Sequence, residues 1–292
     1  MNRTLEHILP RVQKPARYTG GEYNAVVKDR RAVDVRYALC FPDTYEIGMS
    51  NLGVRILYGL MNEMDGVWCE RVFAPWGDME EEMRREGIPL YGLESGDSIA
   101  DFDLIGFSLG YEMAYTNVLN MLDLAGLPLR SGERTELSPI VVAGGTCAFN
   151  PEPLAPFVDL FVLGEGEDVS VEIIQLYRQA REEGWGKEEF LTAAARIPGV
   201  YVPSLYEVSY HGDGTVAAVT PLEGAPARVT KRIVQDFDKS YFPVKTIVPS
   251  TEIVHDRVML EVFRGCIRGC PAIPSVWSSR ASRRAGTPAT RR

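Results

Sequence analysis

The sequence predicts an α/β fold built around a largely parallel, doubly wound sheet. Short apolar runs alternate with amphipathic helical segments over residues 34–183, and each run has the length of a buried strand. Five strands interleaved with helices are typical of a parallel sheet that is covered by helices on both faces. This alternation, rather than any single motif, decides the fold class.

Each element is assigned from its own pattern. The strands are expected at Val35–Phe41, Val67–Phe73, Leu104–Leu109, Ile140–Ala143 and Leu160–Leu163. The helices are expected from an Asn51 cap to about Met64 and at Asp78–Glu86, Met113–Ala125 and Glu165–Arg181. Because ligands of such sheets bind beyond the carboxyl ends of the strands, we expect the loops after Phe41, Leu109, Ala143 and Leu163 to gather on one edge.

The pattern changes after the last of these helices. Two runs, Leu205–His211 and Thr215–Thr220, flank a Gly-Asp-Gly turn and predict a β-hairpin. Residues 223–256 mix prolines with short apolar pieces and indicate an extended linker, and Val258–Phe263 predicts a further strand. The expected divisions of the chain are an N-terminal extension at 1–33, the α/β domain at 34–200, the hairpin and linker at 201–256, a strand segment at 257–270 and a tail at 271–292.

Composition and charge argue against several classes of protein. Forty acidic against 31 basic residues give a net charge of −9, which disfavours non-specific binding of nucleic acid. The sequence has no apolar run of about 18 residues and no signal-peptide pattern at its start, so we expect no membrane association and a cytoplasmic location. Residues 271–292 carry five arginines, no acidic residue and no apolar periodicity, and are expected to be disordered.

The five cysteines differ in their surroundings. An odd number of cysteines in an intracellular chain argues against a disulfide framework. Cys40 and Cys69 lie in apolar strands and are expected in the core, and Cys147 lies in a glycine-rich loop. Cys266 and Cys270 form Cys-Ile-Arg-Gly-Cys after a predicted strand, where two thiolates are either part of a metal or iron–sulfur site or an incidental pair.

The loops at the expected ligand edge lack a nucleotide signature. Gly144 and Gly145 let a backbone approach a ligand closely, or form a tight turn. The loop after the first strand has only Gly48 and Gly53, and residues 164–167 read Gly-Glu-Gly-Glu, whose carboxylates would repel a phosphate. NAD, FAD and P-loop functions are therefore disfavoured.

Four segments in combination resemble a known family. FPDTYEIGMSNLG, GFSLGYE, VVAGGTCAFNPEPLAPFVDLFVLGEGE and LEVFRGCIRGC resemble the cobalamin-binding-domain radical S-adenosylmethionine (SAM) proteins, specifically an uncharacterised YgiQ-like branch, over about residues 5–270. The resemblance implies a Rossmann-like, flavodoxin-like domain of the B12-binding type. It also implies that residues 257–270 begin a radical SAM partial barrel with the first barrel strand.

The resemblance further implies a [4Fe–4S] cluster that binds SAM and cleaves it reductively. Cys266 and Cys270 correspond to the first two cysteines of the family's Cys-x₃-Cys-x₂-Cys motif, and the third position is Ile273. Likeness to the family ends after Cys270, as a shifted reading frame or a natural divergent tail would produce. With two of three thiolates and without the barrel, we expect this chain to be catalytically inactive.

Cobalamin is the second cofactor that the resemblance implies. Many B12 domains ligate cobalt through a histidine after the first strand, whereas residues 8–210 of this chain contain none. At that loop the sequence places Asp43, Thr44 and Tyr45. By resemblance, a corrinoid would bind without histidine ligation.

The groove for the corrinoid's nucleotide tail is assigned in the same way. By resemblance, Ser108, Gly144 and Gly145 would line it. Three functions stay open: part of a radical SAM protein, a stand-alone corrinoid-binding module, or a flavodoxin-like scaffold that acts through protein contacts and holds no cofactor. The expected partners are small-molecule cofactors, and the substrate is left open.

Overall fold

A six-stranded sheet organises the chain in a computed structural model that describes residues 3–262 and 264. The chain divides into two units, Met1–Val254 and His255–Arg292, and the sheet belongs to the first. The strand order is β2-β1-β3-β4-β5-β6. The first five strands in this order follow the flavodoxin-like arrangement, whose ligands bind where the order reverses, between β1 and β3. The predicted α/β, Rossmann-like fold is confirmed.

The strand predictions are confirmed to within one residue at each end. The parallel strands are β1 (Val35–Phe41), β2 (Val67–Phe73), β3 (Leu104–Ser108), β4 (Ile140–Gly144) and β5 (Leu160–Val162). The count of five strands is wrong, because β6 (Val200–Tyr201) pairs antiparallel with β5. Two residues are too few to show a strand periodicity, so the sequence pattern does not reveal β6.

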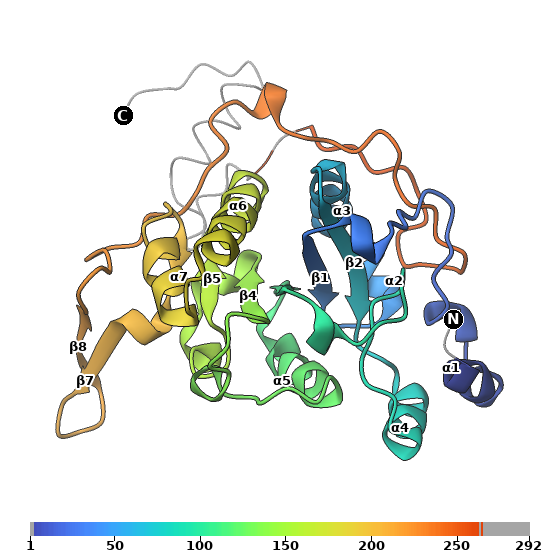
Figure 1. The fold of residues 1–292 in the computed structure, drawn as a ribbon, viewed down its shortest axis with the longest axis horizontal. Helices are drawn as coiled ribbons and strands as arrows, with labels where there is room; N and C mark the ends of the chain where they lie inside the picture. The colour runs from blue at the N-terminus through green and yellow to red at the C-terminus, as the bar shows by residue number, and fades with distance from the viewer. Residues whose placement is uncertain (1–2, 263, 265–292) are drawn as a thin grey trace, which may run out of the picture. The chain divides into compact units, whose positions relative to one another are not determined.

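Helices cover both faces of the sheet (Figure 1). One face packs against α3 (Leu52–Glu63), α6 (Glu167–Glu183) and α7 (Lys187–Ala194). The other packs against α1 (Arg3–Ile8), α4 (Gly77–Glu86) and α5 (Tyr115–Leu124). Strands that are buried on both faces need apolar side chains at every position, which explains the continuous apolar runs of the sequence.

Shorter elements complete the helical structure. A single α-turn, α2 (Tyr45–Gly48), follows β1, and the Asn51 side chain caps α3 by accepting a 3.1 Å bond from the Val54 amide. The helix expected from Met113 begins as a 3₁₀ turn. Single 3₁₀ turns occupy Leu9–Arg11, Pro15–Arg17, Arg30–Ala32, Ile99–Asp101, Glu112–Ala114, Ser131–Glu133, Thr146–Phe149, Glu152–Leu154, Pro203–Leu205 and Phe237–Lys239.

The predicted hairpin is present and the linker packs on the domain. Strands β7 (Tyr206–Tyr210) and β8 (Val216–Pro221) pair antiparallel. Residues 223–254 follow an extended course, but three of their apolar side chains, Val234, Ile247 and Ile253, are buried. Burying these side chains fixes the segment against the domain, so it does not act as a free tether.

Residues 258–262, the described part of a predicted strand, do not form one. Val258–Phe263 is predicted as a strand, yet the described residues 258–262 have no strand structure and Val258, Leu260 and Val262 are exposed. A strand requires a neighbour for its backbone N–H and C=O groups, and this alternating pattern finds none among the described residues. The expected tail at 271–292 lies outside the described residues.

Buried ion pairs fix the β2 side of the sheet. The Arg71 guanidinium, on β2, lies 2.7 Å from carboxylate oxygens of both Glu22 and Glu94, and all three side chains are buried. A buried charge of this kind is strongly destabilising when one partner is lost. The N-terminal segment that carries Glu22 is therefore part of the folded unit. Among the described residues, no helix is long and apolar enough to span a bilayer.

Candidate functional site at the carboxyl edge of the sheet

The loops that follow β1, β3 and β4 meet at one edge of the sheet. The Thr146 hydroxyl donates to the Gly110 carbonyl (3.1 Å) and the Leu109 amide donates to the Gly144 carbonyl (2.7 Å), which joins the β3 and β4 loops. The Asn117 side chain donates to the Pro42 carbonyl (2.9 Å), which holds the β1 loop to α5. The gathering of these loops is confirmed.

Asp43 and Tyr111 bridge the point where the strand order reverses. The Tyr111 hydroxyl donates a short hydrogen bond to the Asp43 carboxylate, and the other Asp43 oxygen accepts from the Thr44 amide (2.7 Å). The hydrogen bond to Asp43 is the main reason that the pKa of Tyr111 rises to about 12. Two of the predicted residues, Asp43 and Thr44, thus lie where an open α/β sheet binds its ligand.

Ser108 and Gly144 lie side by side at the ends of β3 and β4. They are direct register partners, and both are partly exposed. A Cβ atom built on Gly144 would stand 3.6 Å from its nearest neighbour, Val162, which is an ordinary contact. The two side chains of this strip are small, a hydrogen atom and a hydroxymethyl group, and a methyl group at Gly144 would fit beside Val162.

Gly145 has a structural reason to be glycine. Its φ is +100°, and a Cβ there would stand 2.6 Å from the Leu109 carbonyl oxygen. This close approach lets the β4 loop turn back against the β3 loop. Of the two glycines predicted to line a groove, only Gly144 would accept a Cβ atom without a close contact, and Gly145 shapes the loop.

The structure does not bring Tyr45 to the same surface. Its side chain is buried, and its hydroxyl donates a 2.8 Å bond to Glu22 in the Arg71 cluster. Its ring packs edge-on against Phe73. The buried Tyr45 side chain therefore fixes the segment after β1 to the core, while Asp43 and Thr44 lie at the edge of the sheet.

The loop after β5 is occupied by a segment far away in sequence. Gly164 forms a parallel bridge with Arg232, and the Glu165 amide donates to the Arg232 carbonyl (3.1 Å). The Glu165 carboxylate also accepts a short bond from the Val234 amide. Residues 232–234 thus cover the loop after β5. The loops after β1, β3 and β4 are the part of the carboxyl edge that remains for a ligand.

Exposed large apolar side chains lie on the segments that follow β1, β2, β3 and β4. They are Ile47 on α2, Trp76, Tyr111, Met113 and Phe149. Exposed apolar side chains are typical of a binding site where they adjoin one another on a surface. The sequence pattern does not indicate these side chains, because a single apolar residue in a loop gives no periodic signal.

The described residues offer no preformed metal centre. No group of three or more His, Cys, Asp or Glu side chains in the described part of the chain is placed to hold a metal ion. Cys40 and Cys69 are buried core residues, as predicted. Burial raises the pKa of the partly buried Cys147, which keeps this thiol protonated near neutral pH. Cys266 and Cys270 lie outside the described residues.

Comparison with known proteins assigns the family. The model described as "Radical SAM proteins, N-terminal" matches residues 53–203, just over half of the chain and most of the sheet. The chain belongs to this family. The family assignment confirms that the four sequence segments resemble radical SAM proteins.

Individual relatives match parts of the chain. The uncharacterized protein MJ0966 of Methanocaldococcus jannaschii is 28% identical over 140 residues, which are 47% of this chain and 26% of that protein. Two structures of the radical SAM methyltransferase TsrM from Kitasatospora setae are 16% identical, with TM-scores of 0.34 and 0.36. One holds cobalamin and a [4Fe–4S] cluster, and the other holds tryptophan and a SAM analogue. They cover 68% and 67% of this chain, which spans 30% and 31% of theirs.

Proposed function

We propose that the carboxyl edge of the sheet binds a corrinoid, and that the chain is the N-terminal part of a radical SAM protein of the YgiQ-like branch. The observation that carries the proposal is the pair of small, partly exposed side chains at Ser108 and Gly144, together with exposed apolar side chains on the segments that follow the neighbouring strands. A corrinoid is a large, partly apolar ligand that requires a surface without bulky side chains. The resemblance of the four sequence segments to cobalamin-binding-domain radical SAM proteins agrees with this cofactor class.

The corrinoid is held by hydroxyl, carboxylate and backbone groups rather than by an imidazole. Asp43 and Thr44 border the site from the β1 loop, and Ser108, Gly144 and Gly145 border it from β3 and β4. Residues 8–210 contain no histidine that could ligate cobalt from this domain. We expect replacement of His7, His211 and His255 by Gln to leave corrinoid binding unchanged.

Gel filtration with hydroxocobalamin tests the proposal. The 292-residue chain should retain the absorbance of one corrinoid per chain, whereas Gly144→Val and Ser108→Leu, which fill the strip, should lose it. Gly212→Val, in the open turn of the hairpin, is the matched control and should retain it. Absence of retention by the unmodified chain, or equal retention by all variants, rules the proposal out and leaves the protein-contact function for the exposed apolar side chains.

The iron–sulfur site has an incomplete set of donors. We propose that Cys266 and Cys270 are the family's first two cluster ligands, but Ile273 has no lone pair to act as the third. Two thiolates do not fit a cluster that keeps one iron open for SAM. The chain alone is therefore not expected to cleave SAM reductively. The amount of 5′-deoxyadenosine formed after anaerobic reconstitution, compared with a Cys266→Ala control, tests this point.

A further inference from the structure

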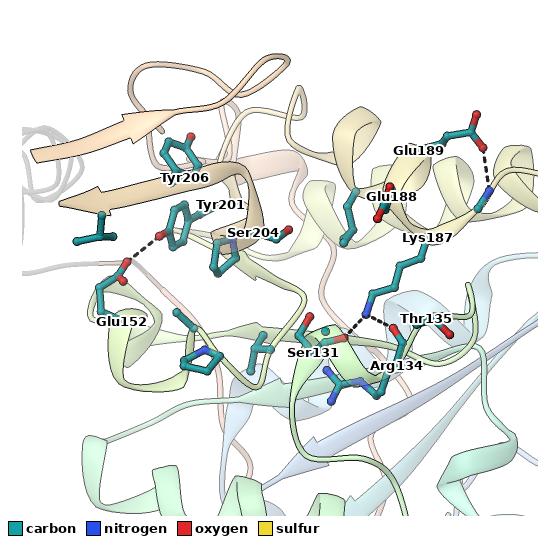
Figure 2. Close-up of a pocket in the computed structure, with 18 residues that line it drawn as sticks. Ser131, Arg134, Thr135, Glu152, Lys187, Glu188, Glu189, Tyr201, Ser204 and Tyr206 are labelled. Atoms are coloured by element: carbon teal, nitrogen blue, oxygen red, sulfur yellow. Dashed lines mark hydrogen bonds between the residues drawn. The ribbon is translucent and has the colours of Figure 1, made fainter.

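A cavity lies beside β6, the last strand in the order of the sheet. It measures about 760 Å³ and lies between β6, the first turn of α7, and strand β7 of the hairpin (Figure 2). We call it the β6–α7 cavity. Its size is within the range of cavities that bind small organic molecules.

The walls of the β6–α7 cavity are mainly apolar and aromatic. The Tyr201 and Tyr206 rings lie side by side on one wall, with centroids 5.1 Å apart. Val158, Leu191 and Val208 contribute aliphatic surface. Two adjacent aromatic faces are suited to the apolar body of a ligand and attract a cation.

The two basic residues of the lining are already used by the protein. Lys187 is buried, and its ammonium group donates to the Ser131 and Arg134 carbonyls (2.8 and 2.6 Å) and to the Asp159 carboxylate (2.8 Å). The terminal nitrogens of Arg134 donate to the carbonyls of Pro128, Leu129 and Phe157 and to Asp159. Neither cation has a terminal nitrogen left for an anionic ligand.

The carboxylates of the lining are accessible instead. Glu152 is exposed and accepts a 2.7 Å bond from the Tyr201 hydroxyl, and Glu188 and Glu189 are exposed on the first turn of α7. Figure 2 shows Glu152 and Glu188 on opposite sides of the cavity. Counting Asp159 with the lining, four carboxylates face two cations, so the cavity carries an excess of negative charge.

We propose that the β6–α7 cavity binds a small organic cation with an aromatic or aliphatic body. The tyrosine pair receives the body and the cationic group, and Glu152 or Glu188 pairs with the charge from the rim. The site is independent of the corrinoid proposal, because the lining of the β6–α7 cavity includes none of the residues that border the corrinoid site.

Phenethylammonium is a suitable probe, with phenethyl alcohol and hydrocinnamate as neutral and anionic analogues. Titration of the 292-residue chain, followed by ligand-observed NMR, should show phenethylammonium binding about fivefold more tightly than the alcohol. Hydrocinnamate should bind most weakly. Equal affinity for the three probes, preference for the anion, or no binding overturns the proposal.

Matched variants locate the site. Val208→Trp fills the cavity and should abolish binding, whereas Ser209→Trp, which faces away on the same strand, should retain it. Glu152→Gln and Glu188→Gln should each weaken phenethylammonium binding about two- to fivefold and leave the alcohol unchanged. Glu207→Gln, on the same hairpin but outside the cavity, should have no effect. Unchanged affinity in Val208→Trp places the probe elsewhere and overturns the assignment.

Discussion

The two edges of the sheet are held together by different interactions. At the amino edge, the aspartate directly before a strand accepts a hydrogen bond from a backbone amide of the neighbouring strand. Asp103, before β3, accepts from the Arg36 amide of β1, and Asp159, before β5, accepts from the Val141 amide of β4, both at 2.7 Å. At the carboxyl edge, loops are joined by backbone bonds, hydroxyl groups and the exposed Asp43–Tyr111 pair. Aspartate carboxylates therefore join neighbouring strands at the amino edge, whereas the Asp43–Tyr111 pair that joins two loops at the carboxyl edge is exposed.

Loss of Asp159 should have the largest effect on stability. This carboxylate is buried and compensates both Arg134 and Lys187, so Asp159→Ala leaves two buried cations without their anion. We expect a loss of about 3–5 kcal/mol in the free energy of unfolding. Urea denaturation measures it, with Asp43→Ala at the carboxyl edge as the control. Similar losses for the two variants would contradict the contrast between the edges.

Alanine substitutions of the neighbouring Gly144 and Gly145, both at the carboxyl edge, should differ in their effect on stability. Gly145→Ala forces a side chain into a φ of +100° and against the Leu109 carbonyl, so it should cost more than about 1 kcal/mol of stability. Gly144→Ala places its methyl group at an ordinary contact distance and should change stability by less than about 0.5 kcal/mol. Thermal unfolding measures both effects. An equal loss of stability in the two variants would show that Gly144 has no room for a side chain.

The smallest expected effect concerns the Asp43–Tyr111 pair. The pKa of Tyr111 lies near 12 in the folded chain, against an ordinary value of 10.0, chiefly because of the hydrogen bond to Asp43. Because the pKa of Tyr111 is raised in the folded state, the stabilisation that the protonated Tyr111 provides is complete below pH 10. It is lost as the pH rises toward 12. In Asp43→Asn the Tyr111 pKa should move back toward 10, which tyrosine-selective NMR titration detects. An unchanged pKa would show that the pair does not form.

The sequence predicted the parts of the molecule that depend on local periodicity. Strands from Val35–Phe41 to Leu160–Val162 were recognisable because burial on both faces leaves a continuous apolar run. The hairpin was recognisable from its Gly-Asp-Gly turn. Asp43, Thr44, Ser108 and Gly144 were identified as edge residues because they follow strands.

Features that depend on partners far away in sequence could not be predicted. Nothing near Tyr45 indicates that its hydroxyl bonds Glu22, or that Arg232 covers the Gly164 loop. The β6–α7 cavity is formed by segments that meet only in the folded chain. Val258–Phe263 shows how a local pattern can mislead. Its alternating residues predict a strand, but a strand also requires a neighbouring strand to pair with.

Two tryptophans report on the two edges and allow the corrinoid site to be located. Trp76 follows β2 at the carboxyl edge, and Trp185 follows α6, which runs back to the amino edge. A paramagnetic cobalt(II) corrinoid broadens nearby fluorine resonances in a protein labelled with 5-fluorotryptophan. We predict that the Trp76 resonance, identified with Trp76→Phe, broadens first and that the Trp185 resonance stays sharp. Broadening of Trp185 first, or of neither resonance, would contradict corrinoid binding at the carboxyl edge.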